Sequence, residues 1–410
     1  MTVDRHAGKA AVLMAANIAA MGLPLISLSL IAHRLGLDAL GTIVLAQSLG
    51  MIPVLLVDAG FNPESMRATA TRDETAPLQP LLDNLLARSR LAIVAAALAL
   101  LASAAIPPLS VGHAAIGLLQ LLGTLLFPQW WLIATGASLS CLSMQLAGRA
   151  ATVAGIALLA HGPEDVTIAM ALQCGATLLS GLMFLATRVA PRARELPLLD
   201  WNAHGGLTRR VRPAVGSGFL LSIASNTPQL VLGAVMGPQQ AALFAAPEKV
   251  ARAGIFALGA VDQTFIAPVA RSRAHSERDA RRYASRVVLA SLAIGILLAA
   301  FIAIASPTIL PLLFGAEFRE ANHIMWLLCV WIPSSCARRS LLNLHYIAQG
   351  RTDLASRCQY AEAVALILFC TAGAAAYGAS GAAAGLLCAE LVAWLAVATI
   401  WRSGEHRSCP

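Results

Sequence analysis

Basic residues avoid every second gap between the long apolar segments of this chain. Apolar runs of about 20 residues are long enough to cross a bilayer as helices. The sequence predicts twelve of them, at residues 10–31, 40–58, 91–111, 113–132, 139–160, 166–187, 214–236, 240–268, 287–311, 321–346, 355–376 and 380–401. Most of the 29 Lys and Arg residues lie at the termini and in the even-numbered gaps, whereas the odd-numbered gaps hold only Arg34 and Arg319. Because short cytoplasmic loops are rich in basic residues, we expect both termini in the cytoplasm and an all-α polytopic protein of the inner membrane.

The composition supports this interpretation. Hydrophobic residues make up 58% of the chain and charged residues only 12%, against about a quarter charged in soluble domains. The formal net charge of +8 resides mainly in short loops, where it favours anionic lipid headgroups over nucleic acid. The cysteines and histidines show no metal-ligand spacing such as CxxC or HExxH. We therefore expect no metal site and no cofactor.

The predicted spans fall into two groups of six. Residues 1–187 form an N-lobe, residues 188–213 a basic cytoplasmic linker and residues 214–410 a C-lobe. The linker contains Pro and Gly breakers, which end helices.

The two predicted lobes carry matched turns. Leu35-Gly36 lies between the first two helices of the N-lobe, and Met236-Gly237 takes the same place in the C-lobe. Ile133–Gly136 and Ile347–Gly350 match in the same way. Because both turns of the second pair are expected at the cytoplasm, the sequence predicts two six-helix lobes related by a parallel pseudo-two-fold repeat. Alternating-access carriers are commonly built so, with the substrate between the lobes.

Apart from Arg357, which is near the start of the eleventh span and is counted with the preceding gap, five basic residues fall inside predicted spans: Arg149, Lys249, Arg252, Arg338 and Arg339. A charge at the centre of a spanning helix costs about 2.5–3.5 kcal/mol, so each should face a cavity or a partner. Arg149 lies deep in the fifth helix and is either a substrate contact or one half of an ion pair. Glu248 and Arg252 have the i, i+4 spacing that lets them neutralise each other, which makes Lys249 the better cavity candidate of the eighth helix. Arg338 and Arg339 lie in the cytoplasmic third of the tenth helix, where one can snorkel to the surface while the other turns towards the cavity, and the sequence leaves open which.

Carboxylates and amides in the predicted spans are further candidates for coupling sites or for the lining of a cavity. Asp262, Glu362 and Glu390 are each either a coupling site for H⁺ or Na⁺ or the partner of an intramembrane arginine. Asp58 closes the second predicted helix and is expected at the interface. Polar or aromatic candidates for a hydrophilic lumen include Asn17, Gln129 and Trp130, although amides also hold helices together in lipid.

A series of short motifs runs in order along nearly the whole chain: Asn17…Arg34-Leu35-Gly36…Gly41, Val57-Asp58-Ala59-Gly60-Phe61, Phe127-Pro128-Gln129-Trp130-Trp131 with Gly136 and Arg149, Phe314-Gly315-Ala316-Glu317-Phe318, Gln349-Gly350-Arg351 and Tyr377-Gly378-Ala379-Ser380-Gly381. This series resembles the bacterial O-antigen and exopolysaccharide flippases, which commonly read FPxW, a glycine turn and an arginine in the fifth helix. The turn after Trp131 departs from the family pattern, because residues 137–144 contain no basic side chain.

The resemblance implies a member of the multidrug/oligosaccharidyl-lipid/polysaccharide exporter superfamily in the bacterial inner membrane. A cationic central cavity would accept an undecaprenyl-pyrophosphate-linked oligosaccharide from the cytoplasmic leaflet and release it on the periplasmic one. Membrane lipids and the polysaccharide polymerase and chain-length machinery are the implied partners. Since no bond is made or broken, no enzymatic activity is expected. Fixed basic charges attract a diphosphate, so Arg149 and Lys249 are the first headgroup candidates and Arg252 and one of Arg338 and Arg339 the second.

Other functions fit the sequence less well. A cation-coupled multidrug exporter of the same superfamily usually needs a carboxylate in its first helices, and none occurs between Asp4 and Asp38. A membrane glycosyltransferase or O-antigen polymerase needs catalytic carboxylates or a large periplasmic loop, and the odd-numbered gaps are short. Lipid II flippases usually have two further helices.

Overall fold

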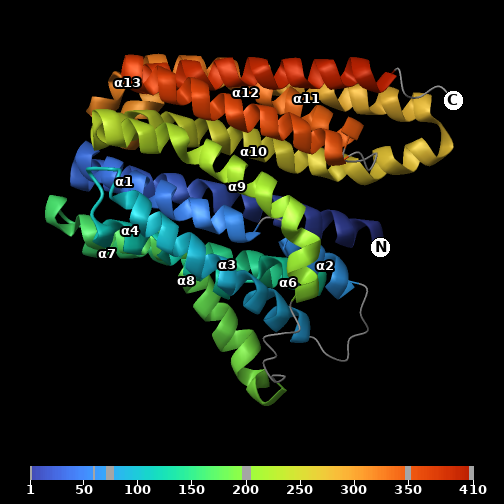
Figure 1. Cartoon of the computed structure of the whole chain (residues 1–410), viewed down its shortest axis with the longest axis horizontal. Coiled ribbons are helices and arrows are strands. Elements are labelled where there is room, and N and C mark those ends of the chain that lie inside the picture. The colour runs from blue at the N-terminus through green and yellow to red at the C-terminus, as the bar shows by residue number, and fades with distance from the viewer. Residues whose placement is uncertain (1, 59–60, 71–77, 196–204, 347–351, 406–410) are drawn as a thin grey trace. The chain divides into compact units, whose positions relative to one another are not determined.

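The computed structural model describes residues 2–58, 61–70, 78–195, 205–346 and 352–405, and every regular element in these ranges is helical. Figure 1 shows the α-helices, which are α1 (Thr2–Asp58), α2 (Phe61–Ala70), α3 (Gln79–Ser103), α4 (Val111–Gly117), α5 (Leu119–Leu126), α6 (Gln129–Ala134), α7 (Ser138–Leu159), α8 (Val166–Phe184), α9 (Gly205–Met236), α10 (Pro238–His275), α11 (Glu277–Phe314), α12 (Asn322–Leu341) and α13 (Thr352–Glu405). The all-α class predicted from the sequence is confirmed.

The chain divides into two compact units, Met1–Ser222 and Ile223–Pro410, and the boundary falls inside α9. In unit 1, α1 packs on α3, α7 and α8, while α7 and α8 pack on each other. In unit 2, α12 packs on α10, α11 and α13. Residues 196–204 of the predicted linker lie outside the described part of the chain, so the predicted lobe boundaries stay predictions.

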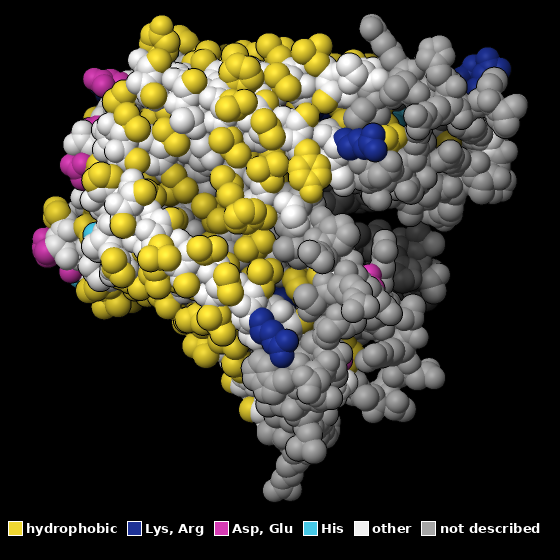
Figure 2. Space-filling model, in the orientation of Figure 1, with side chains coloured by type: hydrophobic (Ala, Val, Ile, Leu, Met, Phe, Trp, Pro, Cys, Tyr) yellow, Lys and Arg dark blue, Asp and Glu magenta, His cyan; other side chains and the backbone are white. Residues whose placement is uncertain are grey.

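Eight helices in the described ranges are long and apolar enough to cross a membrane. Two of them, in α1 and α13, each cover two predicted spans and bend where the sequence places a turn, at Gly36 and at Tyr377-Gly378. Helices α10 and α12 overlap predicted spans but are not among the eight. The number twelve therefore stays a prediction. On the face in Figure 2, the described side chains are mostly hydrophobic, as a lipid-facing surface requires.

The matched glycines of the predicted repeat share a backbone conformation. Gly36 has a φ of 84° and Gly237 a φ of 90°, in the left-handed region that a side chain disfavours. Each stands where one apolar segment ends and the next begins. The predicted turns at these two positions are thus present, and glycine is the residue that permits them.

Arg34, one of the two basic residues in the odd-numbered gaps, has a structural role. Its Nη1 donates to the carbonyl oxygens of Ala157 at 2.5 Å, Ala160 at 3.0 Å and Ile156 at 3.4 Å. The last carbonyls of a helix lack intrahelical donors, and a cation there also complements the helix dipole. Arg34 therefore caps α7 and ties it to α1, which explains its presence outside the basic gaps.

Helix α1 and helix α4 meet through backbone rather than side chains. A Cβ atom added at Gly117 would overlap the carbonyl oxygen of Ala46, whereas one added at Gly175 in α8 would meet nothing within 4 Å. We predict that Gly117→Ala lowers the free energy of unfolding by about 1–3 kcal/mol because the two backbones must separate. The melting temperature of the detergent-purified protein, followed by tryptophan fluorescence, measures this. Gly175→Ala is the matched control, expected to leave stability unchanged or slightly raised, since alanine favours helix; equal melting temperatures for the two variants would contradict the prediction.

Candidate functional site

A buried arginine joins α12 to both halves of α13 in unit 2. The side chain of Arg338 is 2% exposed and forms ion pairs with Glu362 and Glu390. Its Nη1 and Nη2 donate to the two oxygens of Glu362 at 2.7 and 2.6 Å, while Nε and Nη2 donate to those of Glu390 at 2.8 and 3.1 Å. Glu362 precedes the bend at Tyr377-Gly378 and Glu390 follows it. Four of the five N–H donors of Arg338 are thus taken by the two glutamates, and the residue holds the two segments of α13 together.

The two glutamates differ in how fully they are satisfied. Glu390 also accepts hydrogen bonds from Trp331 Nε1 at 3.2 Å, Ser334 Oγ at 3.2 Å and Ser335 Oγ at 2.9 Å, and Trp394 in turn donates to Ser334. A carboxylate has about four lone-pair sites, so little capacity remains on Glu390. Among the described residues Glu362 receives only the two bonds from Arg338. Glu362 is therefore the better placed of the two candidate coupling residues to take a further proton or cation.

The same cluster continues into α10. Arg252 Nε forms an ion pair with Glu248, as their i, i+4 spacing predicts. Gln229 of α9 donates to the other oxygen of Glu248 at 3.3 Å. The guanidinium of Arg252 also lies 5.6 Å from the ring centroid of Trp331, at cation–π distance. We call this connected group, from Gln229 through Glu248, Arg252 and Trp331 to Arg338 and its glutamates, the polar cluster of unit 2.

Arg339 differs from its neighbour Arg338. It is half-buried, and its guanidinium lies 5.3 Å from the ring centroid of Phe256. Among the described residues it makes no ion pair or hydrogen bond, although the charges of Arg252, Glu362 and Glu390 act on it. Of the two adjacent arginines, Arg339 is consequently the one with donors to offer a ligand. Lys249 is half-buried on α10.

In unit 1, Arg149 lies on α7 and is half-buried. Neither a hydrogen bond nor an ion pair links it to any residue in the described part of the chain. Its neighbour Gly148 contacts α8, because a Cβ atom there would lie 2.7 Å from the carbonyl oxygen of Ala176. The ion pair that was the alternative explanation for Arg149 is absent within the described ranges, so a substrate contact remains the better hypothesis.

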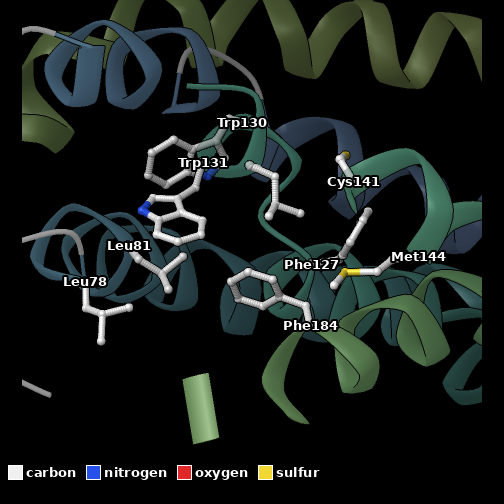
Figure 3. Packing of buried hydrophobic residues seen from close by; sticks show 9 residues of the cluster. Leu78, Leu81, Phe127, Trp130, Trp131, Cys141, Met144 and Phe184 are labelled. Carbon is white, nitrogen blue, oxygen red and sulfur yellow. The ribbon is translucent and has the colours of Figure 1, made fainter. Parts of the chain in front are cut away.

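The aromatic candidates lie at the start of α6. Trp130 is 4% exposed and packs in a hydrophobic cluster, shown in Figure 3, with Trp131, Phe127 and Phe184. The rings of Trp131 and Phe184 meet edge to face with centroids 5.8 Å apart. Trp130 Nε1 has no hydrogen-bond partner among the described residues, whereas Gln129 is exposed. This environment gives Trp130 a packing role, and sugar binding by either residue stays a prediction.

The sequence did not reveal one buried ion pair in unit 1. Asp58, expected at the interface, pairs with Arg88, and Arg88, assigned to a cytoplasmic gap, is 1% exposed inside α3. Arg88 also donates to the carbonyl oxygen of Val57 at 3.1 Å and to Asn84 at 3.3 Å. The assignment of Arg88 to a gap was wrong because α3 begins at Gln79 rather than near residue 91, whereas the interfacial position of Asp58 stays a prediction. The apolar residues at 81, 82, 85 and 86, which recur at helical spacing, were the signal for the earlier start.

The remaining candidates are only partly tested. The side chains of Asn17 and Asp262 lie outside the described part of the structure. No group of three or more His, Cys, Asp or Glu side chains is placed to hold a metal ion among the described residues.

Comparisons with known proteins identify solved structures with a similar fold. No protein-family model matches the chain, and no curated protein matches its sequence. Among the solved structures that share its fold, lipid II flippase MurJ in an inward closed conformation has a TM-score of 0.77 and 10% identity, over 95% of this chain and 87% of that one. A multidrug resistance MATE family transporter of the MOP superfamily in an inward-facing conformation (TM-score 0.71, 14% identity, 95% of this chain and 96% of that one) and the eukaryotic MATE transporter AtDTX14 (TM-score 0.62, 14% identity, 95% and 93% coverage) share it as well. The chain thus has the fold of MOP-superfamily transporters, and with its apolar helices it is a multi-pass membrane protein.

We predict that Arg338→Met lowers the free energy of unfolding by about 3–5 kcal/mol, because the buried Glu390 and the half-buried Glu362 lose their counter-charge. Melting temperature and the folded fraction on size exclusion measure the loss. The triple variant Arg338→Met/Glu362→Gln/Glu390→Gln removes all three charges and should regain part of the stability. A triple variant less stable than Arg338→Met would show that the charges themselves are not the cause.

Proposed function

We propose that this protein is a flippase that moves undecaprenyl-pyrophosphate-linked oligosaccharide units from the cytoplasmic to the periplasmic leaflet. It would work by alternating access through a cationic central cavity, in the inner membrane with both termini in the cytoplasm. The product would feed O-antigen or exopolysaccharide synthesis, together with the polymerase and chain-length machinery. Only the headgroup needs to cross through protein, since the prenyl tail can remain in lipid.

The observation that carries this proposal is the charge balance of the intramembrane residues. Four carboxylates of the predicted spans are described, and each is paired with an arginine: Asp58 with Arg88, Glu248 with Arg252, and Glu362 and Glu390 with Arg338. Arg149 and Arg339 have no carboxylate partner in the described ranges. The charges that these ion pairs do not neutralise are therefore positive, and positive side chains bind a diphosphate favourably.

The residues proposed as headgroup contacts are Arg149, Lys249, Arg252 and Arg339. Arg338 is better assigned to holding α12 and α13 together, because its donors are taken. Glu362 is the proposed coupling residue for H⁺ or Na⁺. The fold shared with lipid II flippase MurJ supports a lipid-linked substrate.

The second candidate is a cation-coupled multidrug exporter, favoured by the fold shared with MATE transporters. An organic cation would need a carboxylate that is free of arginine. Within the described residues the candidates Glu248, Glu362 and Glu390 do not meet this condition. The charge balance therefore ranks this function second.

We predict that Arg149→Ala reduces transbilayer movement of an undecaprenyl-pyrophosphate sugar in proteoliposomes at least about tenfold, equivalent to 1.4 kcal/mol, and that Arg149→Lys restores part of it. The reason is that lysine keeps the charge and loses the bidentate fork. Enzymatic modification of the sugar in the outer leaflet measures the movement.

Arg319→Ala is the matched control, since Arg319 is exposed; its rate should equal that of the wild type. An organic cation dye is tested in parallel vesicles. Dye movement by the wild type without sugar-lipid movement would reject the flippase and support the exporter.

A further inference from the structure

Arg252 is only partly used by the protein. Its Nε is bound to Glu248, but among the described residues its Nη1 and Nη2 donate no hydrogen bond. Its side chain is 24% exposed, against 3% for Glu248. A guanidinium carries five N–H donors in a rigid fork, so the four Nη donors of Arg252 have no partner among the described residues and can bind an incoming oxyanion.

A second cation is held beside α10, one helical turn after Arg252. Arg339 is held over Phe256, and its charge and that of Arg252 repel each other. Trp331 packs against Arg252 and is fixed by its hydrogen bond to Glu390. Two guanidinium groups backed by aromatic rings are thus pre-positioned, and a ligand with two negative charges would relieve their repulsion.

Glu248 opposes such a ligand. It is the nearest anion to Arg252, it is buried, and Gln229 holds its second oxygen. An oxyanion that approaches Arg252 therefore meets a fixed negative charge that cannot withdraw into water. The pairing of Glu248 with Arg252 and the binding of an external anion to Arg252 are in competition.

We propose that Glu248 is an internal counter-anion that competes with the diphosphate of the substrate for Arg252 and so limits how tightly the headgroup is held. This inference rests on the proposed function. It assigns Glu248 to release rather than binding: a carrier must let its cargo go, and a carboxylate that returns to Arg252 replaces the departing diphosphate. Glu248 is a positioning residue here, acting on the ligand through Arg252.

The test measures binding of inorganic pyrophosphate to the full chain in phosphatidylcholine nanodiscs by isothermal titration calorimetry. Glu248→Gln removes the negative charge and keeps an oxygen that can accept the hydrogen bond of Gln229. We expect the Kd for pyrophosphate to fall about tenfold. Glu317→Gln, the same charge change at an exposed position, should leave the Kd at the wild-type value, and Glu248→Gln/Arg252→Gln should lose the gain.

An unchanged Kd in folded Glu248→Gln would overturn the proposal. If that variant does not fold, Glu248→Asp replaces it, because aspartate keeps the charge but draws it back from Arg252; an unchanged Kd there would have the same meaning. Nanodiscs that contain phosphatidylglycerol separate the two sources of phosphate. Loss of the gain in those discs would make this a phospholipid headgroup site and would also reject the proposal.

The inference and the proposed function fail separately. If Glu248→Gln binds pyrophosphate more tightly but the wild type moves no sugar-lipid, the counter-anion role of Glu248 is supported and the flippase function is rejected. If the wild type moves sugar-lipid but Glu248→Gln binds pyrophosphate no more tightly than the wild type, only the counter-anion role of Glu248 is rejected.

Discussion

The burial of Arg338 between two glutamates is the interaction on which unit 2 depends. Desolvating three charges is costly, and good geometry with saturated hydrogen bonds is needed to offset the cost. The bidentate pair with Glu362 and the five donors on Glu390 supply that geometry. Because the two glutamates stand on opposite sides of the bend in α13, the position of α12 and the angle of that bend are set together.

Unit 1 follows the same principle with fewer charges. Asp58 ends α1 and Arg88 lies inside α3, so one ion pair joins two helices that are separated by α2 in the chain. Arg88 then uses its remaining donors on the backbone of Val57 and on Asn84. In both units each described carboxylate of the predicted spans forms an ion pair with an arginine. Among the described arginines of the predicted spans, Arg149 and Arg339 are the two without a carboxylate partner.

The sequence predicted the features that depend on local pattern. The turns at Gly36 and Gly237 and the pairing of Glu248 with Arg252 follow from residue type and helical spacing, and the structure contains them. It could not separate Arg338 from Arg339, because adjacent residues point about 100° apart on a helix and the partners of Arg338 are 24 and 52 residues away. The sequence also assigned Arg88 to a loop, because a hydropathy profile counts every arginine as polar, including one that is buried and neutralised by an ion pair.

The distance in sequence between Arg338 and its partners has a consequence for biogenesis. Helix α12 is not among the described helices that are apolar enough to cross a membrane by composition, and both of its glutamate partners follow it in the chain. Arg338 lies in the last turn of α12, and an arginine that enters lipid without a counter-charge is costly. We therefore expect stable integration of α12 to depend on α13, the later helix that carries both counter-charges.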